Sequence, residues 1–305
     1  MSDTTYHIPV MLRESVDILE VNPRGVYVDA TLGGGGHSRA ILSRLGPEGR
    51  LICLDMDPDA ISNAPDDSRV TALRTNFRFI HNHIRRLGHD RAVDGILADL
   101  GVSSHQFDTP ERGFSFRFDA PLDMRMNTSA GESAADLLNT CDQDRLADIL
   151  HIYGEVDNSR RTAALICAAR QKGALRTTAD LNAAVQSILP PVAPHKTLAR
   201  IYQALRIEVN GEMRSLEHLL SGIARSLRPG GIAAIITYHS LEDRMVKNFF
   251  RCGNISGRQE TDIYGRRPAP FSVITRKPVL PSEAEISQNT RARSAKLRAA
   301  RRTES

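Results

Sequence analysis

The stretch Val26–His37 (VYVDATLGGGGH) decides the expected fold. It opens with β-branched residues, as a buried parallel strand does, and then breaks into four consecutive glycines. Residues 38–45 follow with the apolar spacing of a helix. Strand, glycine turn and helix form the first unit of a nucleotide-binding α/β domain, because glycines let the backbone pass close to a ligand and the helix begins with unpaired N–H groups.

The glycines alone do not identify the ligand. The dinucleotide fingerprint G-x-G-x-x-G lacks its third glycine whether the count begins at Gly33 or Gly34, and no Walker A lysine follows. A second expected strand, Arg50–Asp55, ends in a carboxylate about twenty residues on, which suits the ribose hydroxyls of NAD or of S-adenosylmethionine. Asp29 would repel a pyrophosphate, so its place before the glycines favours the amino-acid end of S-adenosylmethionine.

Composition indicates an ordinary globular chain of one or two domains. The 305 residues are 41% hydrophobic and 25% charged, with a net charge of +4. The four cysteines form no C-x-x-C pair, which predicts reduced thiols in a reducing compartment. We find no signal-peptide pattern and no apolar run of membrane-spanning length, so we expect a cytoplasmic location.

Three later strands are expected to bring functional residues to the same edge of the sheet, where open α/β sheets bind ligands. Val70–Arg74 precedes Phe77, which either packs on an adenine ring or belongs to the core. Val93–Asp99 ends in an acid and continues as a polar loop; the alternative role for Asp99 is a helix cap. The third, Ile232–Tyr238, leads directly into His239.

Tyr238 and His239 have no evident structural role in the sequence, and they lie where a substrate cleft should be. Ser240 and Asp243 instead form the S-x-x-D pattern of a capping box that starts a helix.

The alternation of strands and helices stops at Thr109 and resumes after Asn210, which predicts a helical insertion. Its first part, 109–126, interleaves arginines with aromatic residues and methionines. The helical stretches lie near 133–152, 155–172, 178–189 and 195–209. A helix over 212–227 and a late strand over 271–275 complete the chain.

Two groups of basic residues are candidate sites. His81-x-His83 would point to different faces of a helix and has no acid or cysteine at ligand spacing, so we expect no metal site. The tail 289–302 carries six basic residues, which either contact phosphates or remain solvated.

The motifs resemble those of the RsmH/MraW family of bacterial cytosine-N4 methyltransferases, and they occur in the family's order along most of the chain. They are GGGGHS (33–38), DLGVSSHQ (99–106), ERGFSF (111–116), PLDMRM (121–126), YHSLEDRMVK (238–247) and RARSAKLR (291–298).

The resemblance implies an α/β class I, Rossmann-like sheet that uses S-adenosylmethionine, with an inserted all-helical domain. We place the methyltransferase domain at 1–108 plus 211–305 and the insertion, as the substrate-recognition domain, at 109–210. The implied substrate is a cytidine in the decoding region of 16S ribosomal RNA, near the P site, within the small subunit. Membrane and DNA partners are not expected, and a homodimer is possible.

The resemblance also implies which residues hold the cofactor. These are Gly34, Gly35, Gly36, His37, Asp55, Phe77, Asp99 and Gln106. As a mechanism, we expect Asp99 to accept an N–H of the target amine and Tyr238 or His239 to hold the base. The RNA-contacting candidates are Arg112, Phe114, Phe116, Arg125, Arg291, Arg293, Lys296 and Arg298.

Two other functions stay open at this point. One is a non-catalytic ribosome-assembly or RNA-binding factor that uses the same scaffold. The other is an NAD-dependent oxidoreductase, against which the missing glycine and Asp29 argue.

Overall fold

The computed structural model describes residues 9–102, 107, 109–259 and 269–304. The chain divides into two compact units, and each is described here by itself. Unit 1 comprises Met1–Gly101 with Arg214–Ser305, and unit 2 comprises Val102–Met213. The sequence placed these boundaries at 108/109 and 210/211, within seven residues of the division.

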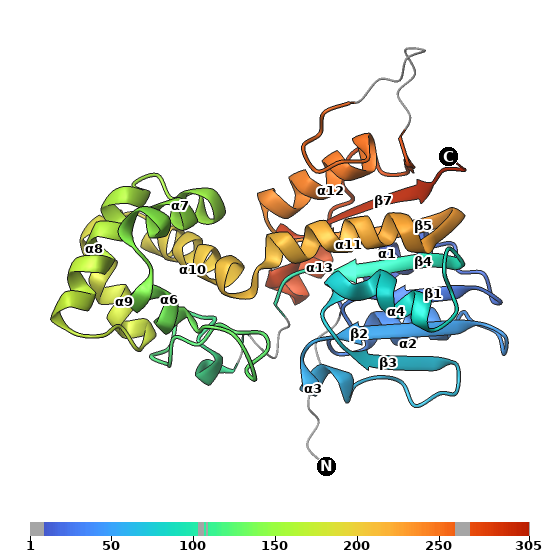
Figure 1. Cartoon of the computed structure of the whole chain (residues 1–305), viewed down its shortest axis with the longest axis horizontal. Coiled ribbons are helices and arrows are strands. Elements are labelled where there is room, and N and C mark those ends of the chain that lie inside the picture. Colours follow the sequence, from blue (N-terminus) through green and yellow to red (C-terminus); the bar gives the residue numbers. More distant parts are fainter. Residues whose placement is uncertain (1–8, 103–106, 108, 260–268, 305) are drawn as a thin grey trace. The chain divides into compact units, whose positions relative to one another are not determined.

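Unit 1 is built on a seven-stranded sheet with the order β3-β2-β1-β4-β5-β7-β6. β1 to β5 are parallel, and β7 runs antiparallel to both its neighbours, so its arrow points the opposite way to β2, β3 and β4 in Figure 1. The strands are β1 (Val26–Asp29), β2 (Arg50–Asp55), β3 (Val70–Arg74), β4 (Val93–Asp99), β5 (Leu227–Thr237), β6 (Phe271–Val273) and β7 (Lys296–Arg302).

Helices cover both faces of this sheet, with α4 and α11 on the near face in Figure 1 and α1 and α2 behind it. The helices of unit 1 are α1 (Leu12–Ile18), α2 (Gly36–Leu42), α3 (Pro58–Ile61), α4 (Ile80–Arg86), α11 (Glu212–Ser226, whose first two residues fall in unit 2), α12 (Ser240–Cys252) and α13 (Glu283–Gln288). Apolar strand residues such as Leu51, Leu97 and Ile236 are fully buried between the layers. The expected α/β sheet with an inserted helical domain is confirmed.

The basic tail differs from the expected solvated or phosphate-binding segment, because its second half is strand β7. Its residues pair with β5 from Lys296 opposite Thr237 to Arg301 opposite Ile232. Leu297, Ala299 and Ala300 are completely buried. Small and apolar side chains between the arginines let the segment enter the sheet, so its charges are distributed along a structural strand.

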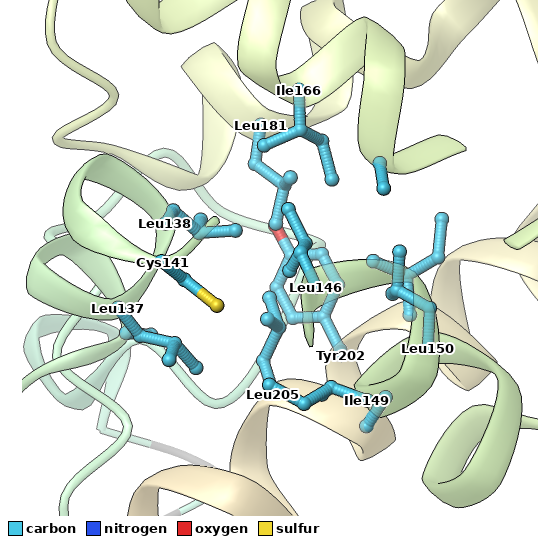
Figure 2. Close-up of a cluster of buried hydrophobic side chains, with 14 of the residues drawn as sticks. Leu137, Leu138, Cys141, Leu146, Ile149, Leu150, Ile166, Leu181, Tyr202 and Leu205 are labelled. Atoms are coloured by element: carbon cyan, nitrogen blue, oxygen red, sulfur yellow. The ribbon is translucent and has the colours of Figure 1, made fainter. Parts of the chain in front are cut away.

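Unit 2 is helical, with a core of its own. Its helices are α6 (Ala134–Thr140), α7 (Gln143–Gly154), α8 (Ser159–Lys172), α9 (Thr178–Val185) and α10 (Pro194–Asn210). Figure 2 shows side chains from these helices converging on Leu146 and Tyr202. The stretch expected as one helix over 133–152 is two helices, because Cys141 takes an extended backbone and the Asp142 side chain caps α7.

None of the helices in the described part of the chain is both long and apolar enough to cross a bilayer.

Candidate functional site

Three acidic residues and a tyrosine lie at the carboxyl edge of the parallel sheet. Asp29 ends β1, Asp55 ends β2 and Asp99 ends β4, and these three strands are neighbours in the order β2-β1-β4. Tyr238 directly follows β5, the strand on the other side of β4. This is the edge at which parallel α/β sheets bind ligands, so the four side chains define the candidate site.

Asp29 organises the turn that leaves β1. Its Oδ2 accepts a hydrogen bond from the Ser38 hydroxyl at 2.6 Å, and its Oδ1 accepts one from the N–H of Thr31 at 3.1 Å. With 1% of its surface exposed, Asp29 lies beneath the ligand-facing edge. It therefore contributes mainly its negative charge to this edge.

The residues of the glycine turn are constrained by packing against the rest of the protein, and not only by the space that a ligand needs. Gly35 has φ +73° and is the N-cap of α2, where a Cβ would lie 2.6 Å from the carbonyl oxygen of Asn63. A Cβ on Gly36 would lie 2.0 Å from Cγ of Pro9. The carbonyl of Gly34 accepts a hydrogen bond from Arg39. Two of the three glycines assigned to the cofactor thus have a steric reason for being glycine that needs no ligand.

His37, the fourth member of the motif, is buried at the start of α2. Its Nε2 lies 3.1 Å from the carbonyl oxygen of Val10, so this nitrogen carries the proton and donates it. His37 thereby anchors the segment before α1 to the glycine turn.

Asp55 closes the turn from the neighbouring strand. Its Oδ2 accepts the N–H of Gly33 at 3.0 Å, and its Oδ1 accepts the N–H of Asp57 at 2.9 Å. Burial raises the pKa of Asp55, and these two backbone N–H groups partly offset the effect. The carboxylate is thus held in one orientation beside the glycine turn, where a ribose diol can bind.

Asp99 is the most perturbed carboxylate of the site. Its N–H donates to Oγ1 of Thr31 at 2.7 Å, and its Oδ1 accepts the Tyr238 hydroxyl at 2.8 Å. Burial raises the pKa of Asp99 to about 6, against the lowering effects of nearby His37 and of the tyrosine hydroxyl. Burial also raises the pKa of Tyr238, with Asp99 adding to the shift, so the phenol stays a donor.

Thr31 was not predicted as a site residue, although it lies within Val26–His37. Its position two residues after the strand-ending Asp29 was the feature of the sequence from which a site role could have been predicted.

His239 has the structural role that the sequence did not reveal. It is the N-cap of α12, and its Nδ1 accepts the N–H of Glu242 at 3.4 Å, so the expected Ser240–Asp243 capping box is wrong by one residue. Glu242 in turn accepts the N–H of Tyr238 at 2.8 Å and is 3% exposed. The cap therefore fixes the backbone that presents Tyr238 to Asp99.

Two other cofactor candidates remain predictions. Phe77 is half-buried in the 3-10 turn Phe77–Phe79 beyond β3, and Asn76 caps that turn. Phe77 thus follows β3, which pairs with β2, the strand that ends in Asp55. Gln106 lies outside the described residues.

The RNA candidates of unit 2 have structural contacts. Phe114 is 4% exposed, so its expected grip on RNA is corrected to a core position. Phe116 packs edge-on against Tyr202, with 5.5 Å between the ring centroids. Arg125 forms an ion pair with Asp123 at 2.7 Å, and Arg112 donates to the carbonyl oxygens of residues 125 and 126.

Among the tail candidates, Arg298 is corrected. It is 6% exposed, and its guanidinium forms two hydrogen bonds with Asp243, the shorter at 2.6 Å. Lys296 lies 3.8 Å from the same carboxylate and is half-buried. Arg293 is exposed and Arg291 half-buried, and their contact with RNA stays a prediction.

The charge of the site determines which cofactor fits it. The negative charge of Asp29 raises the pKa of both Asp55 and Asp99. Within the described part of the chain, none of the three forms an ion pair with a basic side chain. An uncompensated acidic site attracts a cation and repels a pyrophosphate. The donor set therefore fits the sulfonium and ammonium groups of S-adenosylmethionine.

Comparison with known proteins gave matches over nearly the whole chain. A family model described as the MraW methylase family matches residues 4–303. A protein of Parabacteroides distasonis called "Ribosomal RNA small subunit methyltransferase H" is 51% identical over 298 residues, or 98% of each chain. Proteins with the same name are 52% identical over 299 residues in Bacteroides fragilis, again 98% of each chain, and 49% identical over 295 residues in Flavobacterium johnsoniae, 97% of each chain.

Proposed function

The chain belongs to the MraW methylase family, and from this premise we propose that it methylates N4 of a specific cytidine in the decoding, P-site region of small-subunit ribosomal RNA. The relatives' names support ribosomal RNA as the substrate class. The observation that carries the proposal is the hydrogen-bonded pair of Asp99 and Tyr238 at the edge of an acidic site.

The cofactor would be held by the residues around the glycine turn. Asp55 would bind the ribose hydroxyls, and Phe77 would lie against the adenine. Gly34, Gly35, Gly36 and His37 form the turn, and Gln106 completes the set implied by the family. When bound, S-adenosylmethionine supplies an electrophilic methyl group on a positively charged sulfur. The negative charges of Asp29 and Asp99 favour that cation at this edge.

Asp99 is proposed as the acceptor for the target amine. The lone pair of the exocyclic nitrogen of cytosine is delocalised into the ring, so the amine is a weak nucleophile. A carboxylate oxygen that accepts one N–H localises the lone pair and directs it. Tyr238 donates to Oδ1 of Asp99, and we assign the other carboxylate oxygen, Oδ2, to the substrate amine.

The protonation states match this role. A carboxyl with a pKa of about 6 is mostly ionised at neutral pH, yet it is a stronger base than an ordinary aspartate. Tyr238 keeps its proton and continues to donate to Oδ1. Asp99 thus orients the substrate amine by accepting a hydrogen bond from its N–H. Tyr238 stays protonated throughout.

Substrate binding requires the cytosine to leave its stack, as bases do in enzymes that modify them. Unit 2 is proposed to recognise the surrounding RNA. On its exposed surface Phe118, two residues beyond Phe116, is 53% exposed and is a better stacking candidate than buried Phe114.

The test is transfer of labelled methyl groups to small ribosomal subunits that lack the modification, followed by digestion to nucleosides. We expect the label in N4-methylcytidine. Label in another nucleoside would keep the methylase and reject the target. Bound S-adenosylmethionine without transfer to subunits or to their naked RNA would favour the non-catalytic assembly factor.

A further inference from the structure

Four arginines gather at the amino edge of the sheet in unit 1, opposite the candidate site. We call them the amino-edge arginines. Arg85 lies in the last turn of α4 and Arg225 in the last turn of α11. Arg91 precedes β4, and Arg302 ends the antiparallel strand β7, so all four lie where the parallel strands begin.

The sheet and its helices bring these residues together. Val93 of β4 pairs with Leu227 of β5, and Arg91 and Arg225 each stand two residues before that pair. α4 and α11 are in direct contact, since Nδ1 of His81 lies 3.2 Å from Oγ of Ser226.

Arg302 reaches the same edge through β7. Its guanidinium lies 5.7 Å from the centroid of the Phe271 ring, and its Nη1 donates to the carbonyl oxygen of Pro270 at 2.8 Å. These contacts hold the charge in place at the end of the strand.

None of the four forms an ion pair with a carboxylate in the described residues, whereas other arginines at this edge do. Arg228 pairs with Asp94 at 2.7 Å, and Arg301 pairs with Glu20 at 2.7 Å. The positive charge of these arginines acts on the nearby His81. Burial lowers the pKa of His81, and Arg225, Arg85 and Arg91 lower it further. Asp90 raises the same pKa and so opposes them. Burial and Arg91 likewise lower the pKa of Arg302.

Helix dipoles do not account for the cluster. A cation in the last turn of a helix is stabilised by the macrodipole, which explains why Arg85 and Arg225 each lie at the end of a helix. Arg91 lies in a loop and Arg302 at a strand end, and both add repulsion to the group. Clustered like charges destabilise a fold unless a polyanion covers them.

We propose that the amino-edge arginines bind the phosphate backbone of ribosomal RNA at a segment other than the one that carries the target base. The proposal rests on the proposed RNA substrate. β4 alone separates the two edges by roughly 20 Å, which is beyond the reach of the nucleotides next to a base held at Asp99. Guanidinium groups suit phosphate because they donate in a planar fork.

The test compares two double variants of the full-length protein. Arg91→Ala/Arg225→Ala removes two amino-edge arginines. The control, Arg13→Ala/Arg24→Ala, removes the same charge from two exposed arginines that are ion-paired with Asp17 and Glu48. Equilibrium binding to small subunits lacking the modification, and to their protein-free RNA, is measured over a series of KCl concentrations.

We expect the amino-edge variant to lower the slope of log K against log[KCl] by about 1.5 with both partners, since each phosphate contact contributes roughly 0.7–0.9. The control should keep the wild-type slope. Its thermal midpoint should be unchanged, and that of the amino-edge variant should be unchanged or raised, because repulsion has been relieved.

Three results would overturn the proposal: equal slopes in both variants and the wild type, an equal loss in both variants, or a loss with subunits but not with free RNA. The last would point to an acidic ribosomal protein. Because binding is measured without methyl transfer, these outcomes do not depend on the reaction. A wild-type protein that binds RNA but yields no N4-methylcytidine would contradict the proposed function alone.

Discussion

The raised pKa of Asp99, the proposed acceptor of the target amine, comes at the expense of stability. A carboxyl whose pKa is raised in the folded state stabilises the protein most when protonated, below the unfolded pKa of about 4. That stabilisation is lost as the pH rises through about 6. At neutral pH the ionised Asp99 therefore destabilises the fold.

Asp99→Asn should separate the effect of the carboxylate on the rate of methyl transfer from its effect on stability. We expect methyl transfer to fall by at least about 100-fold, the range for loss of a general base. The free energy of unfolding at pH 7.5 should rise by about 2 kcal/mol, since a buried charge is gone and the Tyr238 hydroxyl keeps a carbonyl acceptor. Single-turnover transfer and urea unfolding measure the two changes. A variant with the wild-type rate would remove Asp99 from the mechanism.

The pH profile of methyl transfer follows from the same residue. Activity should fall as the pH drops through about 6, because protonated Asp99 no longer accepts the amine N–H. The measurement is kcat/KM from pH 5 to 8 with RNA binding saturated. A profile that is flat down to pH 5 would contradict the raised pKa or the role of the carboxylate.

His239, which was expected to be catalytic, is the N-cap of α12, and its catalytic role stays a prediction. His239→Asn keeps a side chain that caps helices well, so transfer should stay within about threefold of wild type. His239→Ala should lose about 1 kcal/mol of stability from α12. Thermal unfolding and initial rates distinguish the two roles, since a catalytic histidine would make the Asn variant as inactive as the Ala variant.

At the scale of elements, β7 combines closely spaced basic residues with the small and apolar residues of a buried strand. Arg298 faces α12 and is held by Asp243, while Arg293, in the preceding 3-10 turn, is exposed. The segment enters the sheet because Leu297, Ala299 and Ala300 fit the buried faces between β5 and β6.

Arg298→Ala should therefore act on stability, and Arg293→Ala should not. We expect a loss of about 3 kcal/mol for Arg298→Ala, because it leaves the carboxylate of Asp243 without its buried partner. Arg293→Ala should stay within about 0.5 kcal/mol of wild type. Denaturant unfolding checks both, and equal losses would show that β7 is not packed as described.

At the scale of the whole molecule, the two units have separate cores. One buried cluster is formed within unit 1 around the sheet and another within unit 2 around Leu146 and Tyr202, and these two clusters share no residue. All the described cofactor candidates belong to unit 1.

S-adenosylmethionine should therefore protect the units unequally. At 100 times its Kd it should stabilise the binding-competent unit by about 2.7 kcal/mol. Hydrogen exchange should slow in β1, β2 and β4, and much less in α7 and α8. Equal slowing in both units would show that their stabilities are coupled.

The parallel strands, the acids at their ends and the helical insertion could be predicted from the sequence, because hydrophobic periodicity and strand-ending carboxylates are local signals. The family motifs added the cofactor set. Packing in the folded chain decided which of the candidate residues have structural roles. Phe114, His239 and Arg298 carry the residue types of a functional site, yet packing assigns them to a core, a cap and a buried ion pair. Burial depends on neighbours distant in the chain, such as Asp243 for Arg298, and no local pattern encodes that pairing.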